Sequence, residues 1–381
     1  MQIAIIRKKF TFHGGSESYI NSLIKFLIAK GHKVYIYSIK WQNSPQGLPI
    51  IFKKIPALSF SSFLRDLTFI VFGYFVLRKD RNNIDIIQSH DKFLIQDIYR
   101  AGDGCHIQWL KERWKRVNFF KKIAILLNPY HWLILLIERM IFKGKRFKKV
   151  IAISEMVKRN IVENYELDPD DIVIIYNGTD LDKFEKLDRE TYRNQIRKKF
   201  GIDNKDFVLL FVGSGFERKG VKYLIEAAEK VEQPLTVLVV GKGNSKRYVK
   251  YIKKQRVIFC GPQREIEKFY VASDLFLFPT IYEPFGLVVL EAMASGLPVI
   301  TTKLCGASEI ITHGENGFVV DTPEETHKIA EFIKILTEQK DIYNNMRFKA
   351  RVTASNFSME KNFKNIENLY EIVKSSKGSN K

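Results

Sequence analysis

Two glutamates bracket the segment EPFGLVVLE, residues 283–291. Pro284 suits the first position of a helix, so we expect a helix to begin there. A helix start carries partial positive charge and backbone N–H groups without internal partners, and Gly286 lets a ligand approach them. Glu291 lies one turn beyond Leu287, and helical side chains lean back toward the N-terminus, so both carboxylates can reach the same space. Amides suit phosphate oxygens and carboxylates suit sugar hydroxyls, which predicts a site for a sugar joined to a phosphate. The alternative is a capped core helix with one exposed glutamate.

A second segment, FVGSGFERKG at 211–220, follows a strongly apolar run. Gly213 permits a close approach, and Arg218 and Lys219 supply two cations beside the turn. A pyrophosphate needs such charge both for binding and as a leaving group. The alternative is a basic helix start on the surface. Because cations at a helix N-terminus oppose the helix dipole, this placement favours a functional role.

Two Gly-rich turns in the first half of the chain are weaker candidates. FHGGSES, 12–18, contains Gly14 and Gly15, whose amides could face an anion, although an ordinary tight turn has the same composition. RAGDGCH, 100–106, places Asp103 between two glycines and His106 three residues later. Either side chain could contact a reacting hydroxyl.

Pairs of aspartates that could hold a divalent ion occur at Asp168 and Asp170 and at Asp180 and Asp182. Both pairs have the pattern of turn and cap residues. The charge opposite a diphosphate is already supplied by two cations of the second segment. We therefore expect no metal and no required cofactor.

Short apolar runs alternate with helical patterns throughout, which is typical of parallel α/β architecture. The pattern predicts two Rossmann-like domains in tandem, facing each other across a cleft, with ligands beyond the carboxyl ends of the strands. The expected domains are 1–177 and 178–357. The expected strands are 2–6, 33–38, 84–88, 97–101, 149–153, 172–176, 207–213, 235–241, 256–260, 274–278 and 298–302. The expected helices include 16–30, 62–79, 155–165, 190–200, 220–231, 285–294 and 323–337.

The 381 residues include 62 Lys and Arg against 42 Asp and Glu, a net charge of +20. This excess predicts an anionic partner: nucleic acid, a membrane surface or a phosphorylated substrate. The three cysteines are far apart and odd in number, so we expect no disulfide framework and a reducing, cytoplasmic compartment. The first apolar run is too short for a signal peptide, and no apolar stretch predicts a spanning helix.

Half of the charge excess falls in one segment, 107–149, which has twelve Lys and Arg against two acidic residues. Aromatic residues are interleaved with these charges, and two apolar runs are separated by Asn-Pro-Tyr-His at 128–131. This composition suits the interface of an anionic membrane, and the apolar helix at 62–79 could add to it. The helices could also simply cover the sheet, or line a nucleic-acid groove. The long aliphatic runs favour lipid, so we expect a membrane partner and no nucleic acid.

Taken in order, these motifs resemble those of the GT-B fold glycosyltransferases of family four, which retain the configuration of the transferred sugar. The family's Glu-x7-Glu motif matches Glu283 and Glu291. The resemblance is strongest in GSGFERKG, in EPFGLVVLEAMASGLPVITT and in Cys-Gly at 305–306. It continues more weakly through ISEMVKRNIVENY and YNGTD, and it covers nearly the whole chain. It also implies a C-terminal helix, near 358–376, that returns to the first domain.

The resemblance implies roles for the donor-side residues. Arg218 and Lys219 match the pair on the donor diphosphate, Glu283 matches the glutamate near the transferred sugar, and Glu291 matches the glutamate on the ribose. The matching backbone along the sugar and phosphate belongs to Gly213, Phe285, Gly286 and Leu287.

The resemblance implies further roles elsewhere. Gly15, with Gly14, matches the N-terminal loop against the diphosphate, and Asp103 matches an acidic residue at the acceptor side. Asp103, Glu283, Lys219 and Arg218 are thus the catalytic candidates. The base is expected near 261–264, including Arg264. Many members have arginine where this chain has Ser214.

The implied activity is that of a hexosyltransferase using a nucleotide sugar as co-substrate. Within the family the resemblance is greatest to lipopolysaccharide core glucosyltransferases, which implies glucose, UDP-glucose and a glycolipid acceptor such as the inner core. Other lipid-linked or polysaccharide acceptors and other donors remain open. The expected protein is a monomer held peripherally on the inner face of the cytoplasmic membrane. A non-catalytic nucleic-acid- or membrane-binding protein is the alternative of another class. A nucleotide-sugar isomerase would need an acid–base carboxylate and histidine set that the sequence lacks.

Overall fold

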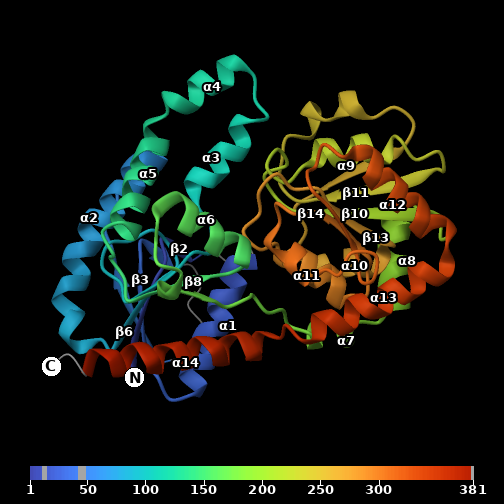
Figure 1. Ribbon diagram of the computed structural model, residues 1–381. Helices are drawn as coiled ribbons and strands as arrows, with labels where there is room; N and C mark the ends of the chain where they lie inside the picture. Colours follow the sequence, from blue (N-terminus) through green and yellow to red (C-terminus); the bar gives the residue numbers. More distant parts are fainter. Residues whose placement is uncertain (11–14, 42–48, 379–381) are drawn as a thin grey trace. The chain divides into compact units, whose positions relative to one another are not determined.

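The structure, a computed structural model, describes residues 1–10, 15–41 and 49–378 (Figure 1). The chain divides into two compact units. Unit 1 comprises Met1–Tyr176 with Asn362–Lys381, and unit 2 comprises Asn177–Lys361. Each unit is built on a parallel β-sheet with helices on its faces, which confirms the expected α/β class with two Rossmann-like domains. The assignment of acceptor and donor roles to the two domains stays a prediction.

Unit 1 has a seven-stranded sheet in the order β5-β3-β1-β6-β7-β8-β9. Its strands are β1 Gln2–Ile6, β3 Lys33–Ser38, β5 Ile50–Lys54, β6 Ile86–Ser89, β7 Ile98–Arg100, β8 Lys149–Ala152 and β9 Ile172–Ile174, with a separate short pair β2 Lys9–Phe10 and β4 Lys40–Trp41. Its helices are α1 Gly15–Ala29, α2 Ser62–Asp80, α3 His106–Trp114, α4 Phe119–Leu126, α5 Pro129–Phe142, α6 Glu155–Tyr165 and α14 Met359–Gly378.

Unit 2 has a six-stranded sheet in the order β12-β11-β10-β13-β14-β15. Its strands are β10 Phe207–Val212, β11 Leu235–Val240, β12 Arg256–Gly261, β13 Leu275–Phe278, β14 Val299–Thr302 and β15 Phe318–Val320. Its helices are α7 Asp182–Glu185, α8 Arg189–Lys199, α9 Val221–Ala228, α10 Ile266–Ala272, α11 Leu287–Ala294, α12 Thr326–Glu338 and α13 Lys340–Ser355.

The order of the strands in unit 2 creates a topological switch point. From β10 the chain moves outward to β11 and β12, then returns to β13 on the other side of β10 and continues to β14 and β15. Right-handed crossovers in opposite directions place α9 and α11 on opposite faces of the sheet (Figure 1). The loops after β10 and β13 therefore diverge between neighbouring strands, which is where open parallel sheets bind ligands.

The central strands follow directly from their composition. Strand β10 reads FVLLFV and β11 reads LTVLVV, and all but the first residue of β10 are buried. Continuous apolar runs of this length are typical of parallel strands covered on both faces. All the strands expected from the sequence are present, with ends shifted by no more than two residues.

Strands β5 and β15 and helix α13 are among the elements that were not expected from the sequence. Strand β5 is a partly exposed edge strand with two lysines, and β15 has only three residues. Helix α13 is polar and buries only Met346, Ala350 and Ala354, so its apolar stripe is made mostly of small side chains. Each element therefore lacks the strong apolar pattern on which the prediction depended.

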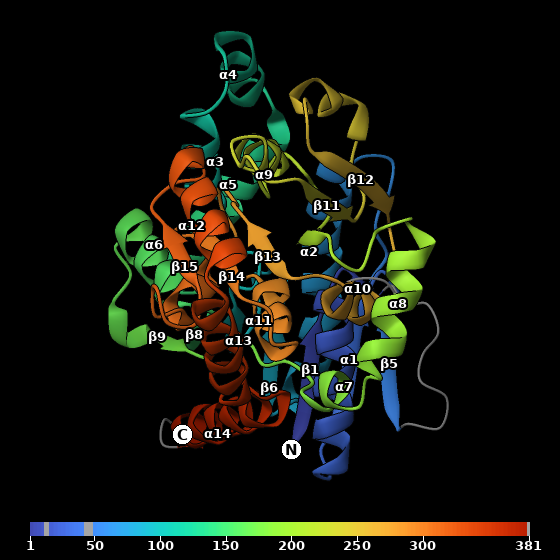
Figure 2. The same cartoon turned by 90° about the vertical axis from the view of Figure 1, so that its right-hand side faces the viewer.

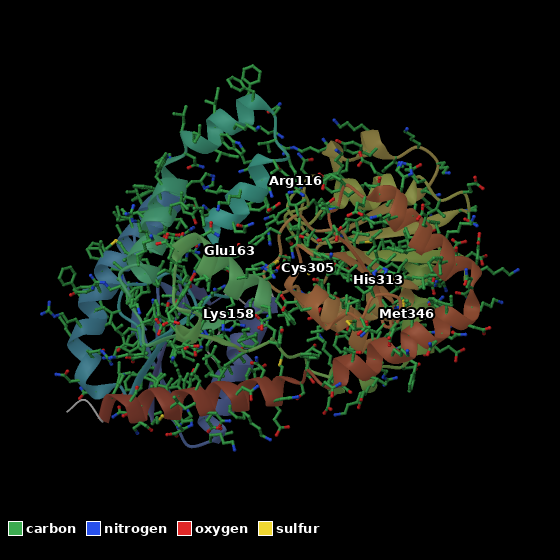
Figure 3. All side chains as sticks on the ribbon, in the orientation of Figure 1. Arg116, Lys158, Glu163, Cys305, His313 and Met346 are labelled. Atoms are coloured by element: carbon green, nitrogen blue, oxygen red, sulfur yellow. The ribbon has the colours of Figure 1, made fainter. Side chains whose placement is uncertain are left out.

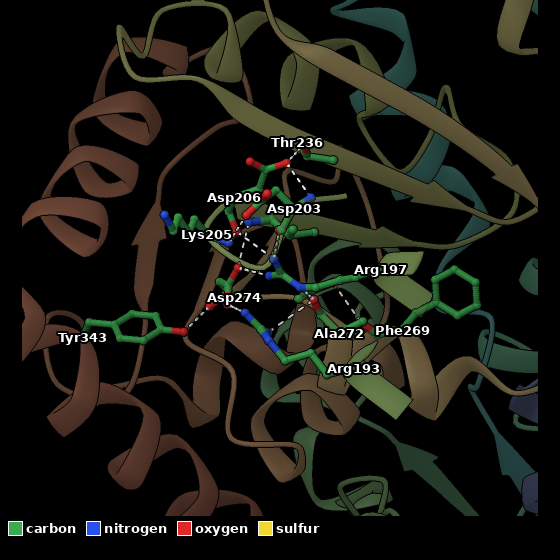
Figure 4. Close-up of polar contacts among 12 residues, drawn as sticks. Arg193, Arg197, Asp203, Lys205, Asp206, Thr236, Phe269, Ala272, Asp274 and Tyr343 are labelled. Carbon is green, nitrogen blue, oxygen red and sulfur yellow. Dashed lines mark hydrogen bonds and ion pairs between the residues drawn. The ribbon is translucent and has the colours of Figure 1, made fainter. Parts of the chain in front are cut away.

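At the N-terminal ends of the unit 2 strands, Asp274 anchors helix α8 to the sheet (Figure 4). Its two carboxylate oxygens accept hydrogen bonds from Arg193 at 2.8 Å and Arg197 at 2.7 Å, and the Val208 amide donates to it at 2.8 Å. The Arg197 side chain is only 1% exposed. This cluster lies at the opposite end of the strands from the switch-point loops, so we regard it as structural.

Helix α14 packs on unit 1, which confirms the expected returning helix (Figure 2). Asn362, near its start, accepts a hydrogen bond from the Tyr19 hydroxyl of α1 at 2.8 Å. Near its middle the Tyr370 hydroxyl donates to Gln88 of β6 at 2.9 Å. The buried side of α14 supplies its hydrophobic contacts with unit 1.

Candidate active site

Arg218 and Lys219 lie in the turn between β10 and α9, and both pair with Glu283 in the loop after β13. Arg218 Nη1 and Lys219 Nζ are each 3.0 Å from Glu283 Oε2. Helix α9 begins only at Val221, so the two cations precede the helix. The carboxylate offsets the repulsion that the helix dipole would otherwise impose on them. This cluster occupies the switch point of the unit 2 sheet.

The backbone holds both cations in place. The Arg218 carbonyl accepts hydrogen bonds from the Ile281 amide and the Thr280 hydroxyl, so the loops after β10 and β13 are joined directly. The Lys219 chain lies against Gly213, where an added Cβ would be 2.5 Å from Lys219 Cδ. Gly213 thus makes the space that the lysine chain needs.

The prediction that a helix begins at Pro284 is wrong. Helix α11 begins at Leu287, and Gly286 caps it with φ +93°. The preceding residues pair instead with the loop after β14: the Glu283 amide donates to the Leu304 carbonyl, and Ala307 donates to the Phe285 carbonyl. Proline is a helix-start signal in the sequence. Here the residues from Glu283 to Phe285 are instead held extended by their hydrogen bonds to the loop after β14, so the helix starts later.

Gly286 is required at the start of α11 on two grounds. Its φ favours glycine, and an added Cβ would be 2.8 Å from the Sγ of Cys305, which is labelled in Figure 3. The Cys305 thiol is buried and lies 3.0 Å from the Phe285 carbonyl. The Phe285 ring is itself buried, so it belongs to the packing beneath the helix start.

The charge state of Glu283 follows from its two neighbours. Burial alone would raise the pKa of Glu283, but Lys219 and Arg218 hold the pKa below its usual range. The carboxylate is therefore ionised at neutral pH and already neutralises part of the positive charge of the cluster. An anionic ligand would have to share these cations with it.

Glu291 lies on α11 one turn from its start, and Tyr270 of α10 orients it. The Tyr270 hydroxyl donates to Glu291 Oε2 at 2.8 Å. Burial raises the pKa of Glu291, and the hydrogen bond from Tyr270 opposes that rise. Sequence reasoning missed Tyr270, since its only signal was an aromatic residue in a helical pattern, which is typical of a core side chain.

The residues expected from the first half of the chain belong to unit 1. Gly14 lies outside the described residues, and Gly15 is the first residue of α1. Asp103 is exposed in the turn after β7, and His106 begins α3. The His106 imidazole contacts His131 at 3.1 Å, and burial, with Lys92 and His131, lowers the pKa of His106 to about 3. His106 is thus neutral at physiological pH.

Arg264 is exposed in the bend between β12 and α10. Asp168 accepts a hydrogen bond from the Asp170 amide at 2.9 Å, the geometry of a turn cap. In the described part of the chain no group of three or more His, Cys, Asp or Glu side chains could hold a metal ion. Independence from metal stays a prediction.

The basic aromatic segment, 107–149, forms most of α3 and all of α4 and α5. In both views α4 lies away from the sheet of its unit (Figures 1 and 2). Phe119 and Phe120 at its start are 70% and 79% exposed. None of the helices described is by itself long and apolar enough to cross a membrane; α4 and α5 meet that measure only as a pair bent by 57°.

Comparison with known proteins identifies two family matches. The description "Glycosyltransferase Family 4" matches residues 13–183, and "Glycosyl transferases group 1" matches residues 192–353. Lipopolysaccharide glucosyltransferase WaaG of Escherichia coli K12 is 25% identical over 348 residues, spanning 89% of this chain and 90% of that protein. A UDP-Gal:alpha-D-GlcNAc-diphosphoundecaprenol alpha-1,3-galactosyltransferase of E. coli is 27% identical, spanning 81% of this chain and 80% of that protein.

Solved structures show the same fold. The crystal structure of WaaG matches with a TM-score of 0.81 at 23% identity, covering 97% of this chain and 99% of that one. Anabaena Alr3699/HepE, solved in complex with UDP and glucose, matches with a TM-score of 0.75 at 20% identity, covering 97% and 99%. These similarities place both units in the GT-B architecture.

Proposed function

Because the chain belongs to the group 1 and family 4 glycosyltransferases, we propose that it moves glucose from UDP-glucose to the inner core of a lipopolysaccharide, with retention at the anomeric carbon. Similarity to WaaG supports the acceptor, and similarity to a protein solved with UDP and glucose supports the donor. The single observation that carries the proposal is the cluster of Arg218, Lys219 and Glu283 at the switch point of unit 2.

In the proposed reaction the donor diphosphate lies against Arg218 and Lys219, in front of the α11 start. As the bond between the anomeric carbon and the phosphate oxygen breaks, negative charge develops on that oxygen. The two cations and the amides at the helix start stabilise this charge. Glu283 accepts hydrogen bonds from hydroxyls of the sugar being transferred, and Glu291, oriented by Tyr270, accepts them from the ribose.

The acceptor hydroxyl attacks the anomeric carbon from the face that the nucleotide leaves. Its oxygen forms the new glycosidic bond, and its proton passes to the departing phosphate oxygen, so UDP is the second product. This route needs no strong enzymic base, and it leaves Asp103 the role of contacting the acceptor. Because the pKa of His106 is low, its imidazole can form a hydrogen bond with the acceptor while it stays neutral.

We also propose that the segment 107–149 associates with an anionic membrane and presents the enzyme to a glycolipid. The location would be peripheral, on the cytoplasmic face. Exposed aromatic side chains on α4 beside lysines support this part of the proposal. Similarity to a galactosyltransferase acting on a diphosphoundecaprenol acceptor keeps another lipid-linked acceptor as a second candidate.

The direct test is release of UDP from UDP-glucose on addition of lipopolysaccharide truncated at the inner core. We expect turnover in the wild type and a fall of roughly 10²–10³ in Lys219→Ala, the usual effect of removing one transition-state donor. Lys222→Ala is the matched control, since Lys222 lies on α9 and pairs with Glu226 at 3.7 Å. Normal turnover in Lys219→Ala would overturn the donor assignment. Turnover only with a diphosphoundecaprenol-linked acceptor would mean that this lipid-linked sugar, and not the inner core, is the acceptor.

A further inference from the structure

Helix α2 exposes a row of apolar side chains on the side away from its own core. Phe69, Ile70, Gly73 and Leu77 are among its buried residues. Leu64, Val71, Phe72 and Phe75 are exposed, Phe75 at 58%. A helix that is apolar on both faces needs a second apolar environment, since water disfavours the exposed row.

The carboxylates on the helices around this row all point into internal contacts. Helices α2 to α5, which lie wholly within the described chain, carry four carboxylates in total. The contacts are Asp66 with Lys8 at 2.8 Å, Asp80 with the Tyr37 hydroxyl at 2.7 Å, Glu112 with Arg116 at 2.8 Å and Glu138 with the Tyr165 hydroxyl at 2.6 Å.

The exposed cations on the same helices complete the pattern. Arg78 and Lys79 lie in the last turn of α2, Lys121 lies on α4 and Arg139 lies on α5, all of them exposed. The outward side of the four helices thus offers apolar groups and positive charge. This combination is complementary to an anionic lipid surface. A nucleic acid would match the cations and could stack bases on phenyl rings, but it has no use for the exposed aliphatic side chains.

The helix that carries the apolar row lies beside a helix of the basic aromatic segment. Helices α2 and α5 pack against one another (Figure 1), and the Tyr130 hydroxyl of α5 donates to Asp66 of α2 at 3.2 Å. Helix α5 exposes Trp132, Leu136 and Met140, spaced by four residues and therefore on one side of the helix.

We propose that α2 is a second lipid-contacting helix, whose apolar row enters the interfacial region of an anionic bilayer beside the segment 107–149. This inference rests on the membrane part of the proposed function and extends it to a helix outside that segment. The segment supplies attraction that salt screens, whereas the row of α2 supplies apolar burial that salt does not weaken. Lipid contact therefore persists at high ionic strength.

The test is sedimentation of the full chain with phosphatidylglycerol-containing vesicles at roughly 0.1 M and roughly 1 M salt, where the screening length falls from about 10 Å to about 3 Å. We expect the double variant Phe72→Ser, Phe75→Ser to bind roughly tenfold more weakly at both salt concentrations. We expect the double variant Lys121→Ser, Lys122→Ser to bind the vesicles more weakly than the wild type only at roughly 0.1 M salt. Phe348→Ser is the matched control, since Phe348 is 68% exposed on α13 of unit 2. Val71→Ser, at another exposed position of the same row, provides an independent variant, and unchanged thermal unfolding verifies that each variant is folded.

Three outcomes would overturn the inference. Vesicle binding of the Phe72 and Phe75 variant equal to that of the wild type would remove α2 from the lipid contact while leaving the segment 107–149 in place. Self-association of the wild type that this variant abolishes, with no change in vesicle binding, would assign the row to a second copy of the chain. A wild type that binds no vesicle at either salt concentration would overturn the membrane part of the proposed function, independently of transferase activity.

Discussion

Replacing Glu283 with Gln separates donor binding from sugar transfer, because the carboxylate competes with a diphosphate for the same two cations. In the structure Arg218, Lys219 and Glu283 together carry one net positive charge, with both cations 3.0 Å from the carboxylate. The variant carries two. An added unit charge about 4 Å from a phosphate is worth about 1 kcal/mol in water and about 4 kcal/mol at an effective dielectric of about 20.

The partial exposure of the cluster sets the value near the lower end of that range. The Arg218 side chain is 33% exposed and that of Lys219 13%, so solvent screens part of the gain. A gain in binding free energy of about 1 kcal/mol predicts that UDP binds Glu283→Gln roughly fivefold more tightly than the wild type. Turnover with UDP-glucose should nevertheless fall, since the amide is a weaker partner for the sugar hydroxyls.

Titration calorimetry with UDP at low salt measures the first effect, and UDP release measures the second. Glu226→Gln is the control, because Glu226 pairs with Lys222 on the exposed side of α9. The tighter binding should shrink as salt is added. Weaker binding of UDP to Glu283→Gln than to the wild type would refute the competition on which the reasoning depends.

Four further predictions concern donor affinity and stability. Tyr270→Phe leaves Glu291 without its orienting hydrogen bond, so the KM for the donor should rise roughly tenfold with little change in kcat, as initial rates would show. Burial raises the pKa of Glu291, so ionisation of its carboxylate destabilises the folded state as the pH rises above the ordinary pKa of 4.5. Glu291→Gln lacks this ionisation. Its unfolding free energy relative to that of the wild type should therefore increase from acid to neutral pH, measured by urea titration. Asp274→Ala leaves a buried arginine of α8 uncompensated and should lower the unfolding free energy by about 3–5 kcal/mol, measured by urea denaturation; a loss under about 1 kcal/mol would contradict the structural role of that cluster. Gly286→Ala should lower the unfolding free energy by about 1–3 kcal/mol and abolish turnover, whereas Gly314→Ala, with a similar φ of +82° and open space around it, should leave turnover unchanged.

Much of the fold and the place of the charged cluster in unit 2 could be predicted because the signals there are strong and local. Continuous apolar strands such as FVLLFV specify a parallel sheet, and the loops that follow them contain the charged residues. The sequence associated Arg218 and Lys219 with a functional position, because their placement before a helix is unfavourable without a counter-charge; that functional role stays a prediction. The structure supplies that counter-charge as Glu283.

What could not be predicted depends on contacts between distant parts of the chain. The start of α11 moved from Pro284 to Leu287 because the residues before it pair with the loop after β14. Tyr270 shows no functional signal until α10 and α11 lie side by side. The inward direction of the carboxylates on α2 to α5 likewise depends on packing, since net charge alone does not say which charges face outward.

The central claim is that the switch point of unit 2 holds the donor diphosphate through Arg218 and Lys219. The most direct measurement is thermal unfolding of the wild type and Lys219→Ala with UDP-, GDP- and ADP-glucose at saturating concentration. We expect UDP-glucose to raise the unfolding temperature of the wild type by several degrees, as about 2–3 kcal/mol of ligand stabilisation would, and to leave that of Lys219→Ala almost unchanged. An equal rise in both proteins, or no rise with any of the three nucleotide sugars, would contradict the claim.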